Sequence, residues 1–140
     1  MKIPILLDDG AIAPMSMRDG DAAFDLAASE AVTIESNTQQ LVGTGVHMAI
    51  PIGFVGLIWD RSGLAAKSQI TTMGGVIDSN YRGEIKVILR NFAPEALAVQ
   101  KGDRIAQMIV QKQCAVSFDV VDSLDETNRG KAGFGSTGLQ

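Results

Sequence analysis

Residues 105–110 read Ile-Ala-Gln-Met-Ile-Val, and this stretch is the most informative about the fold. Its apolar side chains point to both faces of a predicted strand at 104–112, whereas an antiparallel sheet with one face in water alternates apolar and polar residues. The second face must therefore be covered, either by another sheet or by another subunit. The chain has 140 residues, so burial inside one domain and oligomerisation both fit the pattern.

The rest of the chain contains similar short stretches. Each runs for a few residues and is closed by Gly, Pro, Asn or Asp, which is typical of strands and turns. Strands are predicted at 31–34, 40–50, 54–59, 83–91, 104–112 and 115–121. Residues 62–67 alone look helical, over little more than a turn or two. The sequence therefore predicts an all-β fold, a jelly-roll-like β-sandwich or barrel with one short helix.

The C-terminal region has a different character. Residues 122–128 are polar without periodicity, and residues 129–138 contain four glycines. Such a segment forms no stable helix or strand in isolation. It is either a disordered terminus or a flexible arm that closes over an anionic ligand, with charge from Arg129 and Lys131 and hydroxyls from Ser136 and Thr137. The predicted division is a β domain at 1–121 and an arm at 122–140.

The composition argues against several classes of function. A net charge of −4 gives no basic stripe that could bind nucleic acid directly. No apolar run approaches the roughly 20 residues that span a membrane, and the N-terminus is no signal peptide, so we expect a cytoplasmic chain. A single cysteine, Cys114, and a single histidine, His47, are too few for a closed zinc site. His47 alternates with apolar neighbours and is interpreted as a strand residue.

Arg61, Ser62 and Gly63 open the one predicted helix. A helix N-terminus offers unpaired N–H groups and partial positive charge, and an arginine fork, a serine hydroxyl and a glycine amide could complete an anion cradle. The alternative is a simple N-cap with a surface ion pair between Asp60 and Arg61. Taken alone, these residues favour the N-cap.

Residues 74–83 have the pattern of a hairpin, in which two apolar residues precede Asp78 and a turn, and Gly83 starts the outgoing strand. A carboxylate directly after a buried pair needs a reason to be there, so Asp78 is either a turn cap or a general base. Tyr81 would pack on a sugar or on the core. Asp25, flanked by apolar residues, is a buried structural acid or a group that reaches a metal through water. Gln107 could donate to a ligand from its strand.

Five segments together resemble the five motifs of the trimeric dUTPase family, in order and at suitable spacing. They are residues 22–27, 61–67, 75–84, 102–108 and 129–138. Gly-Val-Ile-Asp at 75–78 and Gly-Phe-Gly-Ser-Thr-Gly at 133–138 match the family nearly letter for letter. The resemblance runs from Ala22 to Gly138, and it favours an active-site arm over a disordered terminus and a general base over a turn cap at Asp78.

The resemblance implies a jelly roll that assembles as a homotrimer with three active sites at subunit interfaces. One subunit would give the first, second and fourth motifs, a neighbour the third, and the third subunit its arm. The implied reaction is hydrolysis of dUTP to dUMP and pyrophosphate by attack of water on the α-phosphate, with Mg²⁺ as cofactor. It would limit uracil in DNA and supply dUMP for dTMP synthesis, in the cytoplasm or, for a viral protein, in the host cytoplasm.

The same resemblance implies a role for each motif. Asp78 would activate the water, the main chain of Gly75, Val76 and Ile77 would pair with uracil, and Tyr81 would exclude a 2′-hydroxyl. The phosphates would be bound by Arg61, Ser62, Gly63 and Gln107. Mg²⁺ would sit mainly on triphosphate oxygens and waters, with Asp25 touching those waters. The arm would stack Phe134 on uracil and would bind substrate also through Arg129, Gly135, Ser136 and Thr137.

The sequence departs from the family pattern at a few positions, none of which removes a proposed catalytic group. They are Ala23 for glycine, Trp59-Asp60 where proline is common before Arg61, Asn80 for a second aspartate, and Lys131-Ala132 for a more glycine-rich pair. Two alternatives remain: a dCTP deaminase-like enzyme, which shares the fold but needs a glutamate base, and a nucleotide-gated regulator that binds another protein. The complete arm and Asp78 favour the hydrolase.

Overall fold

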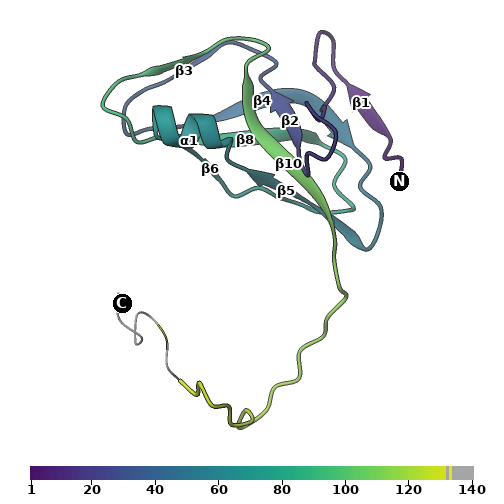
Figure 1. Cartoon of the computed structure of the whole chain (residues 1–140). Coiled ribbons are helices and arrows are strands. Elements are labelled where there is room, and N and C mark those ends of the chain that lie inside the picture. The colour runs from purple at the N-terminus through teal and green to yellow at the C-terminus, as the bar shows by residue number, and fades with distance from the viewer. Residues whose placement is uncertain (132, 134–140) are drawn as a thin grey trace.

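The computed structural model describes residues 1–131 and 133, and it builds them from two four-stranded antiparallel sheets. The first sheet has the order β1 (Ile5–Leu7), β4 (Gln39–Met48), β8 (Glu84–Asn91) and β6 (Ile70–Met73). The second has the order β2 (Phe24–Ala27), β10 (Arg104–Lys112), β5 (Phe54–Trp59) and β7 (Val76–Ile77). A smaller pair is formed by β3 (Val32–Ile34) and β9 (Leu97–Val99), and α1 (Ser62–Ser68) follows β5 (Figure 1).

The two large sheets enclose one apolar core. Val42, Val87 and Leu89 of the first sheet are buried in the same cluster as Leu26 and Met108 of the second. Burying branched side chains of this size from both sheets supplies most of the driving force for such a sandwich. The predicted all-β jelly roll with one short helix is confirmed.

The strand that is most informative in the sequence, β10, lies between β2 and β5. Its register against β2 shifts between Arg104 and Ala106, so a β-bulge places Ile105 and Ala106 both in the core. On the other face Gln107 and Ile109 are half-buried and line a pocket. The pattern of two apolar faces therefore comes partly from the bulge and partly from a pocket wall.

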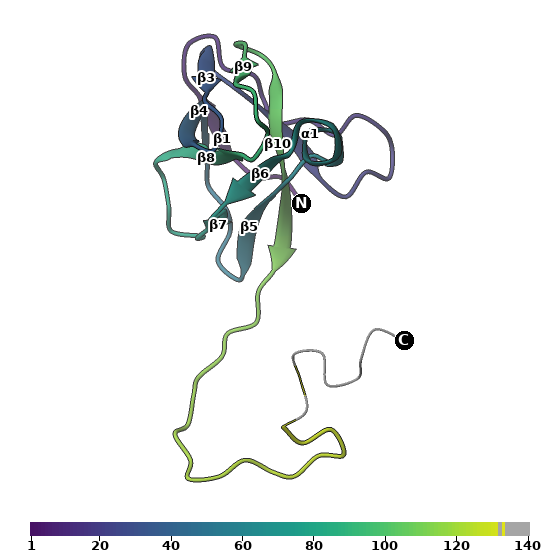
Figure 2. The same cartoon turned by 90° about the vertical axis from the view of Figure 1, so that its left-hand side faces the viewer.

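The predicted hairpin at 74–83 is wrong in its pairing. Tyr81 N–H donates to the Asp78 carbonyl at 3.1 Å, so the turn is present. However, β7 pairs with β5 of one sheet, while the chain after the turn enters β8 of the other. The segment from β7 to β8 thus connects the two layers (Figure 2). Val76 is also 65% exposed, so Asp78 does not follow a buried pair.

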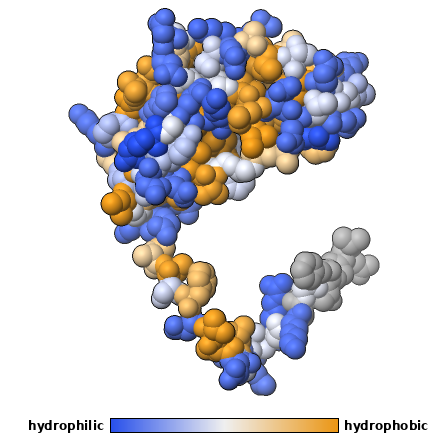
Figure 3. Space-filling view, turned by 180° about the vertical axis from the view of Figure 1, so that it is seen from behind, coloured by the Kyte–Doolittle hydropathy of each residue, from blue (hydrophilic) through white to orange (hydrophobic). Residues whose placement is uncertain are grey.

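The predicted strand at 115–121 is wrong as well. After β10 the chain runs away from the β body, and residues 113–121 have no strand partner in the described chain (Figures 1 and 2). Val116, Phe118 and Val120 are exposed along it, and apolar side chains appear on this segment in Figure 3. An alternating pattern gives strand propensity, but a strand needs a neighbour for its backbone hydrogen bonds.

No described helix has the length and apolar character required to cross a membrane.

Candidate active site

An ion-pair cluster joins three segments that are far apart in the sequence. The Asp25 carboxylate on β2 accepts from Arg61 Nε at 3.0 Å and from Arg104 Nη1 at 2.9 Å. Arg61 Nη1 also donates to the Arg104 carbonyl at 3.0 Å. The Asp25 side chain is only 14% exposed, and both of its oxygens are satisfied. Asp25 thus fixes the guanidinium groups at the start of α1 and of β10.

The predicted ion pair between Asp60 and Arg61 is wrong. Asp60 faces β6 instead, where its carboxylate accepts from the Thr71 hydroxyl at 2.9 Å and from the hydroxyl and amide of Thr72. Burial raises the pKa of Asp60, but these hydrogen bonds from Thr72 and Thr71 outweigh it and hold the pKa below its ordinary value. Asp60 also accepts from Gln107 Nε2 through its carbonyl, at 2.7 Å.

Ser62 and Gly63 follow Arg61 in the first turn of α1, and both are exposed. Arg61 is the N-cap residue, and no side chain caps the helix. The interpretation as a serine N-cap is therefore wrong, and the hydroxyl of Ser62 is not engaged as a cap. A methyl group added at Gly63 would meet open space, so this glycine leaves the helix start accessible.

A pocket of about 500 Å³ lies beside the ion-pair cluster. Its polar walls are Asp21, Asp25, Asp60 and Gln107, and Trp59 lines it as well. The structure thus brings the predicted residues Asp25 and Gln107 to one cavity, and the side-chain bond from Arg61 to Asp25 places Arg61 next to it.

A second pocket, of about 320 Å³, lies at the turn that leads to β8. It is lined by Leu41, Val76, Ile77, Asp78, Tyr81, Glu84 and Lys86. Tyr81 is half exposed, and its hydroxyl donates to the Glu84 carbonyl at 2.9 Å. The Asp78 carboxylate is exposed and makes no hydrogen bond or ion pair within the described part of the chain. It is therefore available to a ligand or to water.

Gly75 shows why the backbone of this motif is special. Its φ of +99° is a conformation that L side chains rarely adopt, and an added Cβ would lie 3.0 Å from the Ile58 carbonyl oxygen. The Gly75 carbonyl accepts from the Ile58 amide at 2.8 Å. The start of β7 is thus held close to β5, and the next two residues, Val76 and Ile77, line the second pocket.

The predicted arm is only partly described. Arg129 and Lys131 are exposed. Phe134, Gly135, Ser136 and Thr137 lie outside the described residues. The two pockets are therefore defined here by the β body alone.

The side chains near Asp25 suit a magnesium ion only if most of its direct ligands come from a substrate and from water. Among the described residues, no group of three or more His, Cys, Asp or Glu side chains could hold a metal by itself. Both Asp25 oxygens already accept from arginines, so direct coordination would disrupt two ion pairs. Mg²⁺ keeps several waters and prefers phosphate oxygens, and an ion held by a triphosphate with Asp25 reaching its waters fits this site.

Three site residues were not assigned from sequence. Arg104 is expected only as the first residue of the strand at 104–112, yet it completes the cluster around Asp25. Trp59 is expected only as a departure from the family pattern, and Asp60 only as a departure and as an ion-pair partner of Arg61, yet both line the larger pocket. The usable signal is the position of Trp59 at the end of β5 and two residues before Arg61, because a large indole ring next to an anion-binding candidate can pack against a ligand.

The chain is similar to known proteins over most of its length. The dUTPase family model matches residues 9–138. The deoxyuridine 5'-triphosphate nucleotidohydrolase of Rhodococcus erythropolis is 47% identical over 135 residues, covering 94% of this chain and 82% of that protein. The enzyme of the same name from Helicobacter pylori is 43% identical over 142 residues, covering 99% of this chain and 98% of that protein.

Solved structures show the same fold. The dUTPase of Staphylococcus bacteriophage 80alpha, in complex with dUPNHPP, superposes with a TM-score of 0.92 at 24% identity and covers 99% of both chains. A mutant dUTPase from phage phi11 of S. aureus, described with a structural Mg(II) ion, gives 0.83 at 22% identity over 90% of this chain and 100% of that one. With the family model matched over almost the whole length and relatives at nearly half identity, the chain belongs to the dUTPase family.

Proposed function

We propose that the chain hydrolyses dUTP to dUMP and pyrophosphate, with Asp78 as the base that activates water for attack on the α-phosphate. The observation that carries this is the exposed Asp78 carboxylate, which lines the same pocket of about 320 Å³ as Tyr81 and makes no hydrogen bond or ion pair within the described chain. An unengaged carboxylate can accept a proton from water, and general-base catalysis contributes about 10²–10⁴-fold.

The substrate's uracil would pair with the main chain of Gly75, Val76 and Ile77. A rigid backbone edge can reject the methyl of thymine by contact and the amino group of cytosine by mismatched donors. The fixed position of Gly75 against Ile58 supports this, because the edge cannot yield to a larger base. Tyr81 would lie against the deoxyribose.

The triphosphate would bind at the first pocket, which Gln107 lines, and would extend to Arg61, Ser62 and Gly63 at the adjacent start of α1. Arg61 is already oriented by Asp25, and Gln107 by the Asp60 carbonyl, so little ordering remains to be done when the phosphates arrive. Mg²⁺, bound to phosphate oxygens and to waters that contact Asp25, would supply positive charge to the triphosphate.

We further propose that the active site is shared within a homotrimer. Asp78 lines the second pocket, whereas Asp25 and Gln107 line the first and Arg61 contacts Asp25, so a substrate that contacts Asp78 of one subunit and Arg61 of another fits a site shared between them. Exposed apolar side chains on β1, at Val76 and along 115–121 provide the surface that an obligate assembly buries. The arm at 122–140 would come from the third subunit, with Arg129, Gly135, Ser136 and Thr137 near the phosphates and Phe134 on the uracil.

This activity would limit uracil in DNA and supply dUMP for dTMP synthesis. We place it in the cytoplasm, or in the host cytoplasm if the chain is viral. Neither a nucleic acid nor a membrane is needed as a direct partner, since the net charge is −4 and the substrate is a free nucleotide.

A deaminase reaction on dCTP is not favoured. It needs a glutamate base beside the pyrimidine, and Glu84 is the glutamate that lines the second pocket. Burial raises the pKa of Glu84, but hydrogen bonds from the Gly45 amide and from Lys86 outweigh it and hold the pKa below its ordinary value. A carboxylate so engaged is a structural group. The regulator alternative predicts loss of Asp78 or Arg61, and both are present.

Pyrophosphate and ammonia should be assayed separately with dUTP, dCTP, dTTP and UTP, with and without Mg²⁺. We expect pyrophosphate from dUTP alone, at a rate that falls when Mg²⁺ is chelated. Ammonia from dCTP without pyrophosphate would overturn the hydrolase proposal.

Replacing Gly83 with alanine should disturb the selection of the sugar. An added Cβ would lie 2.6 Å from Tyr81 Cζ, so the ring must move and its hydroxyl must leave the Glu84 carbonyl. We expect the ratio of kcat/KM for dUTP to that for UTP to fall about tenfold, with little loss of stability because the ring can rotate into solvent. Tyr81→Phe is the matched control, since it removes the hydroxyl and keeps the ring. An unchanged ratio in Gly83→Ala would remove Tyr81 from ribose selection.

A further inference from the structure

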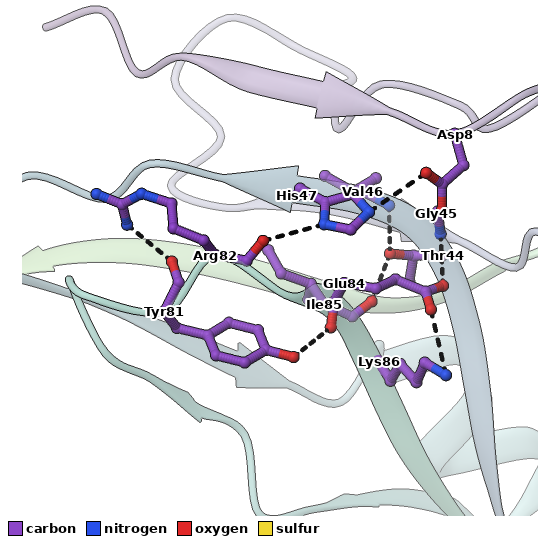
Figure 4. A network of polar contacts seen from close by, with 10 residues as sticks. All are labelled: Asp8, Thr44, Gly45, Val46, His47, Tyr81, Arg82, Glu84, Ile85 and Lys86. Atoms are coloured by element: carbon purple, nitrogen blue, oxygen red, sulfur yellow. Dashed lines mark hydrogen bonds and ion pairs between the residues drawn. The ribbon is translucent and has the colours of Figure 1, made fainter.

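His47, on β4, contacts two oxygen atoms that belong to different parts of the fold. Its Nδ1 lies 3.1 Å from the Arg82 carbonyl oxygen, in the turn before β8, and its Nε2 lies 3.3 Å from the Asp8 carboxylate, just after β1 (Figure 4). Asp8 is itself attached to β4, because its amide donates to the Gly45 carbonyl at 2.8 Å. The imidazole ring therefore bridges β1 and the turn that carries Asp78 and Tyr81.

The chemistry of these contacts restricts the protonation state of the ring. A carbonyl oxygen accepts hydrogen bonds and cannot donate, and the same holds for an ionised carboxylate. A neutral imidazole has one N–H, so one of its nitrogens would direct a lone pair at an oxygen. Only the imidazolium ion donates to both partners at once. Rotating the ring so that Nδ1 and Nε2 exchange places does not change this conclusion, because both partners are acceptors.

The charges that face His47 favour this cation. The hydrogen bond to the Arg82 carbonyl has the largest effect and raises the pKa of His47, whereas partial burial lowers this pKa. The hydrogen bond and charge of Asp8, and the charge of Glu84, raise the pKa further, so that it lies above its ordinary value. Two cations are near. Lys86 pairs with Glu84 at 3.2 Å, and the Arg82 guanidinium donates to the carbonyls of Ser79 and Tyr81 at 2.8 Å each.

The turn that contains Ser79, Tyr81 and Arg82 is held together by several hydrogen bonds. Arg82 Nη1 donates to the carbonyl of Ser79. It also donates to the carbonyl of Tyr81, and the Tyr81 hydroxyl donates to the Glu84 carbonyl (Figure 4). The Glu84 side chain accepts from the Gly45 amide at 2.9 Å, at the bulge where the register of β4 shifts against β8. Glu84 thus secures the chain where the turn meets β8, and His47 contacts the turn two residues earlier, at Arg82.

We propose that His47, as the imidazolium ion, is a positioning residue for the reaction: it holds the turn of Asp78 and Tyr81 against β4, and this hold weakens when the ring loses one of its two N–H donors. This rests on the proposed function of that turn. The direction follows from the raised pKa: both contacts of the ring are donated below the pKa of an unfolded histidine, and one of them is lost as the pH rises through the folded value. Substrate should therefore bind less well on the alkaline side of the His47 titration.

The first test is an NMR titration of the whole protein. The chain has one histidine, so the imidazole signals belong to His47 without further assignment. We expect a midpoint above that of the same chain unfolded in urea, and a lower midpoint in Asp8→Asn, which removes the anionic partner. Asp9→Asn is the matched control, because Asp8 and not Asp9 contacts His47 in the described chain. A midpoint at or below the unfolded value would overturn the proposal.

The second test is kinetic, with dUTP from about pH 5.5 to about pH 9. In the unmodified chain we expect KM to rise about three- to tenfold across the His47 midpoint, the range of one net hydrogen bond, with a smaller change in kcat. His47→Gln cannot titrate and should lack this step, and Asp8→Asn should move it to lower pH. Parallel profiles in all three chains would overturn the proposal.

A third measurement separates this proposal from the proposed function. Exchange of the Tyr81 amide hydrogen, which bonds to the Asp78 carbonyl, reports closure of the turn without any substrate. We expect exchange to quicken in His47→Gln, and in the unmodified chain above the His47 midpoint by more than the intrinsic rise in exchange rate. If dUTP is not hydrolysed but this exchange follows His47, the proposed function fails alone. If dUTP is hydrolysed and exchange ignores His47, the positioning role fails alone.

Discussion

Asp78→Ala is expected to lower kcat for dUTP by about 10²–10⁴-fold, the contribution of a well-placed general base. Asp78 lies in an exposed turn, and its carboxylate has no partner in the described chain, so its removal leaves no buried group unsatisfied. The fold should therefore tolerate the change, and dUTP should still bind through the backbone of 75–77 and through the phosphate site. Single-turnover rates and equilibrium binding of a non-hydrolysable dUTP analogue would measure the two effects separately.

Two variants make this test specific. Asp78→Asn keeps the shape of the side chain but removes its basicity, and it should be almost as slow as Asp78→Ala. Ser79→Ala is the matched control in the same turn, because Arg82 bonds to the Ser79 carbonyl and not to its hydroxyl. Turnover unchanged in Asp78→Ala, or lost equally in Ser79→Ala, would exclude Asp78 as the base.

A chain that ends at Asn128 is expected to assemble normally and to lose most of its turnover, by about 100-fold or more. The β body holds the core and all of the described strands, so removing residues 129–140 leaves folding intact. What is lost is the proposed closure, which excludes water from the phosphates and adds Arg129 and the hydroxyls of Ser136 and Thr137. Sedimentation would follow assembly, and pyrophosphate release would follow turnover.

The control for truncation is a chain that ends at Gly138, which keeps the whole arm motif and should retain full activity. Full activity in the chain ending at Asn128 would contradict the assignment of the arm. Dissociation of that chain into monomers would contradict it in another way, because the arm would then be an assembly element and not a cover for the substrate.

The sequence was sufficient for strands whose pattern is local. The bounds of β5 and β10 agree with the prediction at both ends, since apolar residues and turn residues mark them directly. The pairing of Val76 and Ile77 was missed because it depends on a distant strand: these residues lie opposite Leu57 and Gly56 and not opposite the strand that follows them. A turn in the sequence indicates a reversal of the chain, and it does not say which sheet receives each side.

The same limit applies to the candidate site, because contacts between residues that are distant in the sequence cannot be read from the sequence. The resemblance to a family assigned Asp25, Arg61 and Gln107, and the structure places them together, but their partners were hidden in the sequence. Asp25 meets Arg104, which lies 79 residues away, and Asp60 turns from its neighbour Arg61 to the threonines of β6. Neighbours in an extended chain point in opposite directions, so an adjacent acid and base seldom pair.

Trp59 has a practical consequence. It is the single tryptophan of the chain and is 56% exposed. It lines both the cavity beside Asp25 and another pocket, which Gly75 also lines. Its indole fluorescence should therefore respond when a nucleotide displaces water from either side, with no other tryptophan to dilute the signal. Trp59 is therefore an intrinsic fluorescence probe, and stopped-flow mixing can measure the rate of ligand binding without an added label.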